Sequence, residues 1–265
     1  MQVLGNHQSG ASGMNQIKLL KSDFERDGYV VVREFLKGVD LKLLKDNLDR
    51  YIRDVVPLVA AGDAFYEDRQ RPETLKQLHR IEQDAFFKDY LDHPMWREAA
   101  EALLGEKVHT PEGAEWFNKP PNTNHVTPAH QDNFYFCLRP SQVLTMWLAL
   151  DTVDEENGCL RYVRGSHLLG IRPHSRTKTL GFSQGISDFG EGDLVHEGPV
   201  HAKPGDVLIH HGNTIHRADA NKSPTRHRRS FGMVFKGLSC VRDEVAYRRY
   251  LDSSNQQHQE MGIKK

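Results

Sequence analysis

The chain has 265 residues, of which 38% are hydrophobic and 27% charged, and this length and balance suit one globular domain of ordinary composition. Its 35 basic and 36 acidic residues give a formal net charge of -1, so no overall field would draw it onto nucleic acid or an anionic membrane. The three cysteines are isolated and support neither a disulfide framework nor a zinc ribbon, which fits a soluble protein of the reducing cytoplasm.

Polar segments mark both ends of the predicted domain. Residues 1–16 are rich in Gly, Ser and Asn and residues 253–265 are polar, so we expect both tails to be disordered. The first residues lack the apolar run of a signal peptide, and no stretch holds about 18 uninterrupted apolar residues. The sequence therefore predicts a single domain over residues 17–252 that does not span a membrane.

The first part of this domain is predicted to be mostly helical. A short helix over residues 22–28 is followed by a β-branched strand over residues 29–32. From Asp40 to Pro57 apolar residues recur at three- and four-residue spacing, which predicts a helix that lies against a sheet. A further helix follows Pro94 and ends at Gly105, where a helix C-cap belongs.

Short apolar runs separated by Pro and Gly turns dominate the chain from about residue 108 to residue 240. These runs cover residues 114–118, 143–150, 159–163, 207–210 and 230–235. Their length and spacing predict an antiparallel β-sandwich or barrel. The stretch 171–200 contains five glycines and little periodicity, so we expect a long surface loop or a lid over a site.

Two histidines and one aspartate are candidates for a metal site. His130 and Asp132 lie in the segment 129–136, whose aromatic residues favour a strand, and residues two apart in a strand point to one face. His216 follows a predicted strand and a turn, so it would approach from a different strand. Such a set leaves three coordination positions open, which suits Fe(II) with a bidentate co-substrate and O2.

The histidine content leaves other ligand sets open. With 15 histidines in 265 residues, a His-x-Asp triplet arises easily by chance. The strand-borne His210 is the nearest rival to His216. The rival ligands are His125, His201, His210, His211 and His227, and each is more simply explained as a surface or hydrogen-bonded histidine.

A basic cluster lies on the next predicted strand after His216. One of its arginines could hold the distal end of a dicarboxylate in a guanidinium fork. On a strand, Arg229 shares a face with the aromatic Phe231, whereas Arg228 shares the other face with Ser230. Periodicity alone does not choose between the two arginines.

Five motifs follow one another in order between residues 117 and 230. They are Phe117-Asn118-Lys119-Pro120-Pro121, Pro128-Ala129-His130-Gln131-Asp132, Asn157-Gly158-Cys159-Leu160 leading to Arg164-Gly165-Ser166-His167, Gly205-Asp206-Val207 with His216, and Arg228-Arg229-Ser230. Together they resemble the phytanoyl-CoA dioxygenase family of Fe(II)/2-oxoglutarate-dependent oxygenases, over about residues 22–240. The resemblance implies a mostly β fold with flanking helices: a double-stranded β-helix (jelly-roll, cupin-like) core packed against N-terminal helices.

The resemblance also implies residue roles. It assigns Fe(II) to His130, Asp132 and His216, with 2-oxoglutarate and O2 as co-substrates, and it selects Arg228 for the far carboxylate of 2-oxoglutarate. The implied reaction is hydroxylation of an unactivated C-H bond with release of succinate and CO2. The carboxylate of Asp132 argues against halogenation, because halogenating relatives vacate that position. Further cofactor-binding candidates are Trp147, Asn118 and Lys119.

Several questions stay open from the sequence. Ala218 replaces a hydroxyl residue that some relatives use on the dicarboxylate, and Arg164 replaces the proline of a common Pro-Gly-Ser-His segment. The alternatives to an oxygenase are a cupin-like metal enzyme that does not use 2-oxoglutarate, with His210 or His211 as ligands, and a non-catalytic β-barrel binding module. The substrate is a small molecule, and the oligomeric state is not fixed. Basic residues that could attract an anionic substrate are Arg172, His174, Arg176, Lys178, Arg217 and Arg226.

Overall fold

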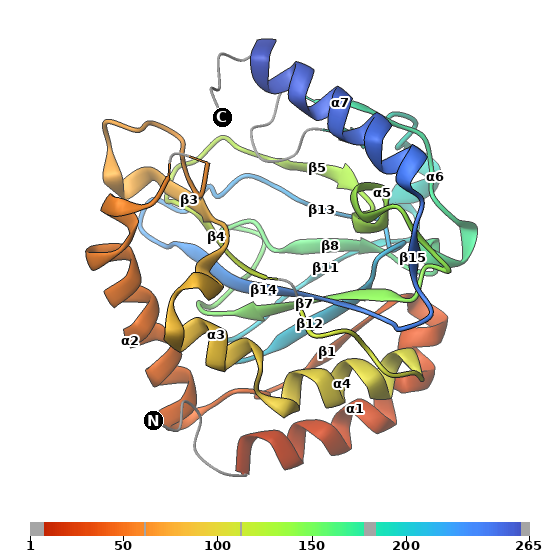
Figure 1. Ribbon diagram of the computed structural model, residues 1–265, viewed down its shortest axis with the longest axis horizontal. Helices are drawn as coiled ribbons and strands as arrows, with labels where there is room; N and C mark the ends of the chain where they lie inside the picture. Colours follow the sequence, from red (N-terminus) through yellow and green to blue (C-terminus); the bar gives the residue numbers. More distant parts are fainter. Residues whose placement is uncertain (1–7, 61, 112, 178–183, 261–265) are drawn as a thin grey trace.

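The computed structural model describes residues 8–60, 62–111, 113–177 and 184–260, and its strands form two main antiparallel sheets that face one another (Figure 1). The larger sheet has the order β1 (Tyr29–Val32), β12 (Val207–His211), β7 (Val143–Ala149), β14 (Arg228–Lys236), β4 (Ala114–Lys119), β3 (Leu75–Leu78) and β2 (Ala64–Tyr66). The smaller sheet has the order β11 (Glu197–Val200), β8 (Leu160–Val163), β13 (His216–Ala218) and β5 (Thr127–His130). The predicted jelly-roll core is confirmed.

The central strands of the larger sheet are buried on both faces. In β7, Met146 and Leu148 pack into the outer core, whereas Trp147 packs into the inner one between the sheets. In β14 the side chains of Phe231 and Met233 belong to the outer core. Because side chains alternate along a strand, Arg228 of β14 points inward, into the space between the sheets.

Four helices cover the outer face of the larger sheet (Figure 1). They are α1 (Gln8–Asp27), α2 (Gly38–Asp54), α3 (Ala85–Leu91) and α4 (Pro94–Leu104). The ring of Phe231 lies 6.0 Å from that of Phe87 and 5.4 Å from that of Tyr90, and all three are fully buried. Each such side chain stabilises the fold by about 1.5–3 kcal/mol. Within the described ranges, no helix combines the length and apolarity that a bilayer span requires.

Shorter elements connect the sheets and close one end of the molecule. The helix α7 (Glu244–Glu260) lies across the end that carries β5, at the top of Figure 1. In the part of the chain that the structure describes, the remaining helices are α5 (Asp132–Phe136), α6 (Glu191–Leu194) and 3-10 turns at Val56–Leu58, Pro72–Thr74, Ile81–Gln83 and Ser166–Leu169. The remaining strands are β6 (Leu138–Arg139), β9 (His174–Arg176), β10 (Gln184–Ile186) and β15 (Val241–Arg242).

The two predicted tails differ most from the structure. Residues 8–16, expected to be disordered, begin α1, and residues 253–260 end α7. Tertiary contacts explain both helices. Gly13 lies so close to the ring of Phe35 that a Cβ there would be 2.6 Å from it, and Arg176 of β9 binds Ser253 and Gln256 of α7. The predicted tail residues 1–7 and 261–265 lie outside the described residues.

Other predicted segments are correct in kind but differ in extent. The strand at residues 29–32 and the helix that ends at Gly105 are confirmed, and Gly105 has the left-handed φ of 75°. The second helix begins at Gly38 rather than Asp40. The stretch 171–200 is not one irregular loop: it contains β9, β10, α6 and β11, although residues 178–183 are not described.

Candidate metal centre

Two paired strands and one helical turn bring the three predicted metal ligands together. His130 ends β5 and His216 begins β13; the two residues are opposite one another in the ladder, and their ring centroids are 4.1 Å apart. Asp132 begins α5. One ligand atom from each of the three residues lies within 4.8 Å of the other two. The group could therefore hold one metal ion with two imidazoles and one carboxylate.

The prediction that the segment 129–136 is a strand is correct for residues 129 and 130 and wrong for the rest. The chain leaves β5 after His130 and forms α5 over Asp132–Phe136, which stops at Cys137 in a left-handed conformation. The side chain of Gln131 is fully buried and donates to the carbonyl oxygens of Gly170 and Asn213, at 2.8 and 2.7 Å. These tertiary bonds hold a turn that overrides the strand preference of the aromatic residues.

Backbone carbonyls fix the orientation of both histidine rings. His130 Nδ1 lies 2.8 Å from Pro128 O, and His216 Nδ1 lies 3.0 Å from Thr214 O. A carbonyl oxygen only accepts, so each ring donates from Nδ1 and keeps the lone pair of Nε2 for a metal. Both Nε2 atoms face one oxygen of Asp132, Oδ1, at 3.5 and 3.6 Å.

The other oxygen of Asp132 is already occupied by hydrogen bonds. Thr145 Oγ1 donates to Oδ2 at 2.6 Å, and His210 Nε2 lies 3.0 Å from the same oxygen. Burial alone would raise the pKa of the Asp132 carboxyl, but His216, His130 and His210 hold that pKa well below its usual value. Burial also lowers the pKa of His216 well below its usual value, so Asp132 and His216 have the protonation states that metal ligands need.

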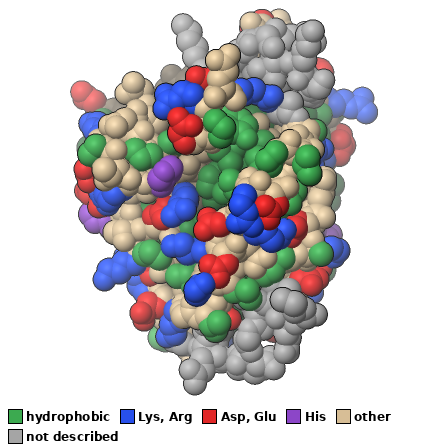
Figure 2. All heavy atoms as spheres, turned by 90° about the vertical axis from the view of Figure 1, so that its left-hand side faces the viewer, with side chains coloured by type: hydrophobic (Ala, Val, Ile, Leu, Met, Phe, Trp, Pro, Cys, Tyr) green, Lys and Arg blue, Asp and Glu red, His purple; other side chains and the backbone are tan. Residues whose placement is uncertain are grey.

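The metal centre opens into a cavity of about 550 Å³ between the two sheets. The cavity is lined by both polar and apolar side chains. They include residues of the inner face of the larger sheet and aromatic residues of α5 and α7. Its lining includes His130, Asp132, His216, Arg228, Trp147, Thr145, Phe117, Lys119, Leu160, Tyr135, Phe136, Tyr250, Gly232 and Val234. On the face that carries the left-hand side of Figure 1, hydrophobic side chains gather in the upper half and are bordered by both acidic and basic side chains (Figure 2).

Arg228 lies at the same cavity as the metal centre and is buried without a bonded anion. Its side chain is 4% exposed, and its Nε has no hydrogen-bond partner among the residues that the structure describes. The guanidinium carbon lies 5.4 Å from the ring of Trp147. Burial lowers the pKa of Arg228 to about 10, which leaves it cationic at neutral pH. A buried cation of this kind is costly unless an anion joins it.

Arg229, by contrast, already has a carboxylate. It points to the opposite face of β14, where its Nε and Nη2 donate to the two oxygens of Asp151 at 2.9 and 2.8 Å. Strand alternation combined with the position of the core thus separates the two arginines, which sequence periodicity had left equivalent. Ser230, on the same face as Arg228, is fully buried, and its hydroxyl likewise lacks a partner within the described part of the chain.

The structure places Asn118 and Lys119 differently from each other. Lys119 lies opposite Arg228 in the ladder and faces the cavity, but its Nζ donates to three carbonyl oxygens, of His125, Ala218 and Asp219. Its three donors are therefore engaged, and burial lowers the pKa of the Lys119 amine well below its usual value. Asn118 lies opposite Arg229, and its amide is bonded to Leu75 O and His227 Nδ1, so its side-chain groups are engaged away from Arg228.

The basic residues considered for an anionic substrate are mostly paired with acidic ones. Arg172 binds Asp188 and Asp193, and Arg217 binds Glu197 and Asp219. Arg226 binds Asp154 and Glu156, and Arg176 binds Glu260. The ring of His174 stacks on Phe134 at 4.0 Å, and Lys178 lies outside the described residues. These contacts favour structural roles for the described members of the group.

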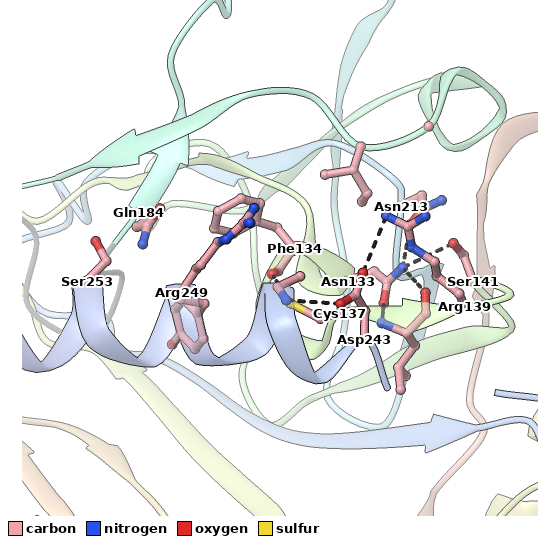
Figure 3. Close-up of a pocket in the computed structure, with 15 residues that line it drawn as sticks. Asn133, Phe134, Cys137, Arg139, Ser141, Gln184, Asn213, Asp243, Arg249 and Ser253 are labelled. Atoms are coloured by element: carbon pink, nitrogen blue, oxygen red, sulfur yellow. Dashed lines mark hydrogen bonds and ion pairs between the residues drawn. The ribbon is translucent and has the colours of Figure 1, made fainter. Parts of the chain in front are cut away.

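A second cavity, of about 700 Å³, lies on the other side of α5 (Figure 3). Asn133 and Phe134 of α5 face Arg249 and Ser253 of α7 there. Asn133 donates to Leu138 O, Ser141 Oγ and Asn213 Oδ1, each at 3.1 Å. This network fixes the turn that carries Asp132, so we interpret these residues as support for the metal centre.

Sequence reasoning missed four residues that complete the site: Thr145, Tyr162, Ser230 and Tyr250. Ser230 could have been found, because it lies two residues from Arg228 on one strand face. Thr145 and Tyr162 show no distinguishing signal in a single sequence. Tyr250 reaches the cavity from α7, where its ring lies 5.4 Å from that of Tyr135.

A jelly-roll core with a His-Asp-His cluster and a buried, unneutralised arginine is the arrangement of non-haem iron oxygenases that use 2-oxoglutarate. Solved structures share the fold. The epimerase SnoN in complex with Fe3+, alpha ketoglutarate and nogalamycin RO superposes with a TM-score of 0.68 at 22% identity, covering 86% of each chain. EctD from S. alaskensis, with 2-oxoglutarate and 5-hydroxyectoine, gives 0.67 at 19% identity over 83% of this chain and 76% of that one.

The family model for phytanoyl-CoA dioxygenase (PhyH) matches residues 24–230, and the chain belongs to this family. It is 25% identical over 237 residues to the peroxisomal phytanoyl-CoA dioxygenase of Bos taurus, covering 82% of this chain and 67% of that protein. It is 26% identical over 213 residues to a probable alpha-ketoglutarate-dependent hypophosphite dioxygenase of Stutzerimonas stutzeri, covering 76% and 72%. The chain thus spans about two thirds of the length of its mammalian relatives. The predicted family, enzyme class, iron and 2-oxoglutarate are confirmed.

Proposed function

We propose that this oxygenase hydroxylates an unactivated C-H bond of a small organic substrate while 2-oxoglutarate is converted to succinate and CO2. His130, Asp132 and His216 hold Fe(II) in this proposal, and Arg228 binds the far carboxylate of 2-oxoglutarate. Bound Fe(II) supplies the redox chemistry that activates O2. The protein positions the reactants and keeps water away from them.

The observation that carries the proposal is the unpaired Arg228 beside an open His-Asp-His cluster. The two features line one cavity. The cluster could hold a metal that the keto acid end of 2-oxoglutarate can chelate, and Arg228 lacks an anion that the far carboxylate can supply. A guanidinium fork binds a carboxylate through two parallel hydrogen bonds. 2-Oxoglutarate would thus neutralise Arg228 with one end and chelate the metal with the other.

Three further side chains support this binding mode. The hydroxyl of Ser230 is buried on the Arg228 face and is available for the same carboxylate, which offsets the missing hydroxyl at Ala218. The ring of Trp147 covers the guanidinium and excludes water from it. Lys119 lines the cavity beside Arg228 and holds β4 to Ala218 and Asp219 through its Nζ, whereas Asn118 holds β4 to β3 through its bond to Leu75 O.

In this proposal, the substrate binds in the part of the cavity that 2-oxoglutarate does not fill. Val234 lies opposite Thr145 in the ladder and so borders the Asp132 side of the cluster, together with the rings of Tyr135 and Tyr250. These walls favour an organic group of modest size against the metal. The relatives are named for phytanoyl-CoA and for hypophosphite, which are chemically very different. Similarity to these relatives therefore does not identify the substrate.

We also propose a reducing compartment such as the cytoplasm, because Cys137, Cys159 and Cys240 are all free thiols.

The proposal is tested by succinate release from Fe(II)-loaded protein under air with a panel of small organic substrates. The expected result is slow consumption of 2-oxoglutarate alone, and one succinate per hydroxylated product with the right substrate, with one oxygen atom of 18O2 in that product. Consumption of 2-oxoglutarate that is independent of Fe(II), or a product that gains no oxygen from O2 under coupled turnover, would contradict hydroxylation.

A further inference from the structure

His210 lies against the metal centre without being part of it. It comes from β12, is 2% exposed, and its ring centroid is 4.3 Å from that of His216. The group of possible ligands nevertheless consists of His130, Asp132 and His216. Both nitrogens of His210 are engaged elsewhere: Nε2 lies 3.0 Å from Asp132 Oδ2, and Nδ1 lies 2.9 Å from the hydroxyl of Tyr162.

The partners of His210 fix which nitrogen carries its proton. A carboxylate oxygen only accepts, so Nε2–H donates to Asp132. In the neutral ring Nδ1 is then an acceptor, and the hydroxyl of Tyr162 donates to it. Tyr162 is itself held in place, because it is fully buried and its ring stacks on Tyr29 with centroids 4.4 Å apart at 14°. A chain of two hydrogen bonds, which we call the His210 relay, thus runs from Tyr162 through His210 to Asp132 and holds His210 in place.

We propose that His210 is a positioning residue that, together with Thr145, restricts Asp132 to coordinating Fe(II) through the single oxygen Oδ1. Both donors bind Oδ2, and Oδ1 alone faces Nε2 of His130 and Nε2 of His216. A carboxylate with both oxygens free can bind a metal through both and fill one more coordination position. The three-residue set serves O2 and a bidentate keto acid when three positions stay open. This inference rests on the proposed function.

The test is anaerobic titration of Fe(II) and then 2-oxoglutarate into variants, with the visible metal-to-ligand charge-transfer band as the readout. His210→Phe keeps a ring of similar size but removes the donor. We expect its dissociation constant for Fe(II) to rise by about 10- to 100-fold, the range typical for loss of a partner that orients a metal ligand. The charge-transfer band should also shift or weaken at saturating Fe(II), because a second carboxylate oxygen competes for the metal.

A conservative variant and a fold control separate positioning from simple stability. His210→Gln can place an amide N–H near the position of Nε2, so most of the Fe(II) affinity and the wild-type band should return. His210→Phe leaves the Tyr162 hydroxyl without a partner, and the double variant His210→Phe/Tyr162→Phe removes that orphan. The melting temperature of the double variant should equal or exceed that of His210→Phe. Its affinity for Fe(II) should stay as weak as that of His210→Phe.

His211 provides the matched control. It is the next residue of β12 and points to the other side of the sheet, where its ring lies 6.3 Å from that of Phe24 and 5.4 Å from that of His167. His211 Nδ1 accepts from Asn213 N at 3.0 Å, so the control variant is His211→Asn, whose amide oxygen can keep that acceptor. His211→Asn should bind Fe(II) and 2-oxoglutarate like the wild type. Equal losses in the variants of His210 and His211 would mean that the effect comes from general damage to β12, which would overturn the inference.

Two further outcomes would also overturn it. If His210→Phe matches the wild type in both affinity and spectrum, the relay does not position Asp132. If His210→Gln loses as much affinity as His130→Gln, then His210 is a ligand rather than a positioning residue. A wild-type protein without any charge-transfer band would instead contradict the proposed function itself, so the two failures are distinguishable.

Discussion

The two ends of the cavity are prepared for their ligands in opposite ways. At the metal end, backbone carbonyls bind the histidine rings, and Thr145 and His210 bind Asp132, so the polar atoms that face away from the metal are satisfied. At the other end, Arg228 is buried with no anion bonded to it in the described structure. Under the proposed function, the first end is ordered before the metal binds, whereas the second holds an unneutralised charge that 2-oxoglutarate would neutralise.

The largest expected effect comes from the metal end. Asp132→Ala removes one of three ligands and leaves the donors Thr145 and His210 without their acceptor. We expect Fe(II) affinity to fall by more than about 100-fold, beyond the range for partners that only orient a ligand, and succinate formation to fall below detection. Calorimetric titration with Fe(II) under anaerobic conditions measures the first effect. Near-wild-type affinity would show that the metal binds elsewhere.

Removing the positive charge of Arg228 should weaken the binding of 2-oxoglutarate rather than the binding of Fe(II). Arg228→Met deletes the carboxylate fork, and breaking a buried charge pair costs about 3–5 kcal/mol. The dissociation constant for 2-oxoglutarate should rise by at least about 100-fold, while that for Fe(II) stays within a few fold. A comparable loss of affinity for both ligands would show that the two ends are not separate.

The same substitution should stabilise the protein when no ligand is bound. Replacing even a buried ion pair by apolar side chains of similar volume is often stabilising by about 1–4 kcal/mol. Arg228 has no bonded carboxylate to lose among the described residues, and a buried charge without one is costly. Urea denaturation of the metal-free and 2-oxoglutarate-free protein measures this change. A large decrease in stability would mean that Arg228 supports the fold and is not held ready for a ligand.

Arg229 gives the smallest effect and the matched control. Arg229→Met breaks a pair with Asp151 on the outer face, and because the Arg229 side chain is 33% exposed, solvent weakens that pair. The expected cost is about 1 kcal/mol of unfolding free energy, with 2-oxoglutarate affinity unchanged. Weaker 2-oxoglutarate binding in this variant would contradict the division between the two faces of β14.

Much of the architecture could be predicted from local patterns, and the site could be predicted only in part. The strand at residues 29–32 and the Gly105 cap follow from residue preferences. The segment 129–136 does not, because the tertiary bonds of Gln131 bend it into α5. Alternation places Arg228 on the inner face of β14 once the other face is known to be covered by helices. The role of His210 needs side-chain geometry, which one sequence does not contain.

The polar ends of the chain illustrate the same limit. Residues 8–16 and 253–260 carry few apolar residues, so composition predicts disorder. Their helices depend on contacts with Phe35 and Arg176, which come from distant parts of the chain. The composition of a segment shows how much apolar surface the segment itself can bury. It does not show which distant residues will contact the segment in the folded chain.

The central claim is that one ferrous ion and one 2-oxoglutarate bind together between the His130–Asp132–His216 cluster and Arg228. Anaerobic titration of the Fe(II)-loaded protein with 2-oxoglutarate, followed by the charge-transfer band, tests it most directly in the wild type, Arg228→Met and Arg229→Met. We predict a band that saturates at one 2-oxoglutarate per iron in the wild type and Arg229→Met, and that needs at least about 100-fold more 2-oxoglutarate in Arg228→Met. No band in the wild type, or equal affinity in all three proteins, would contradict the account.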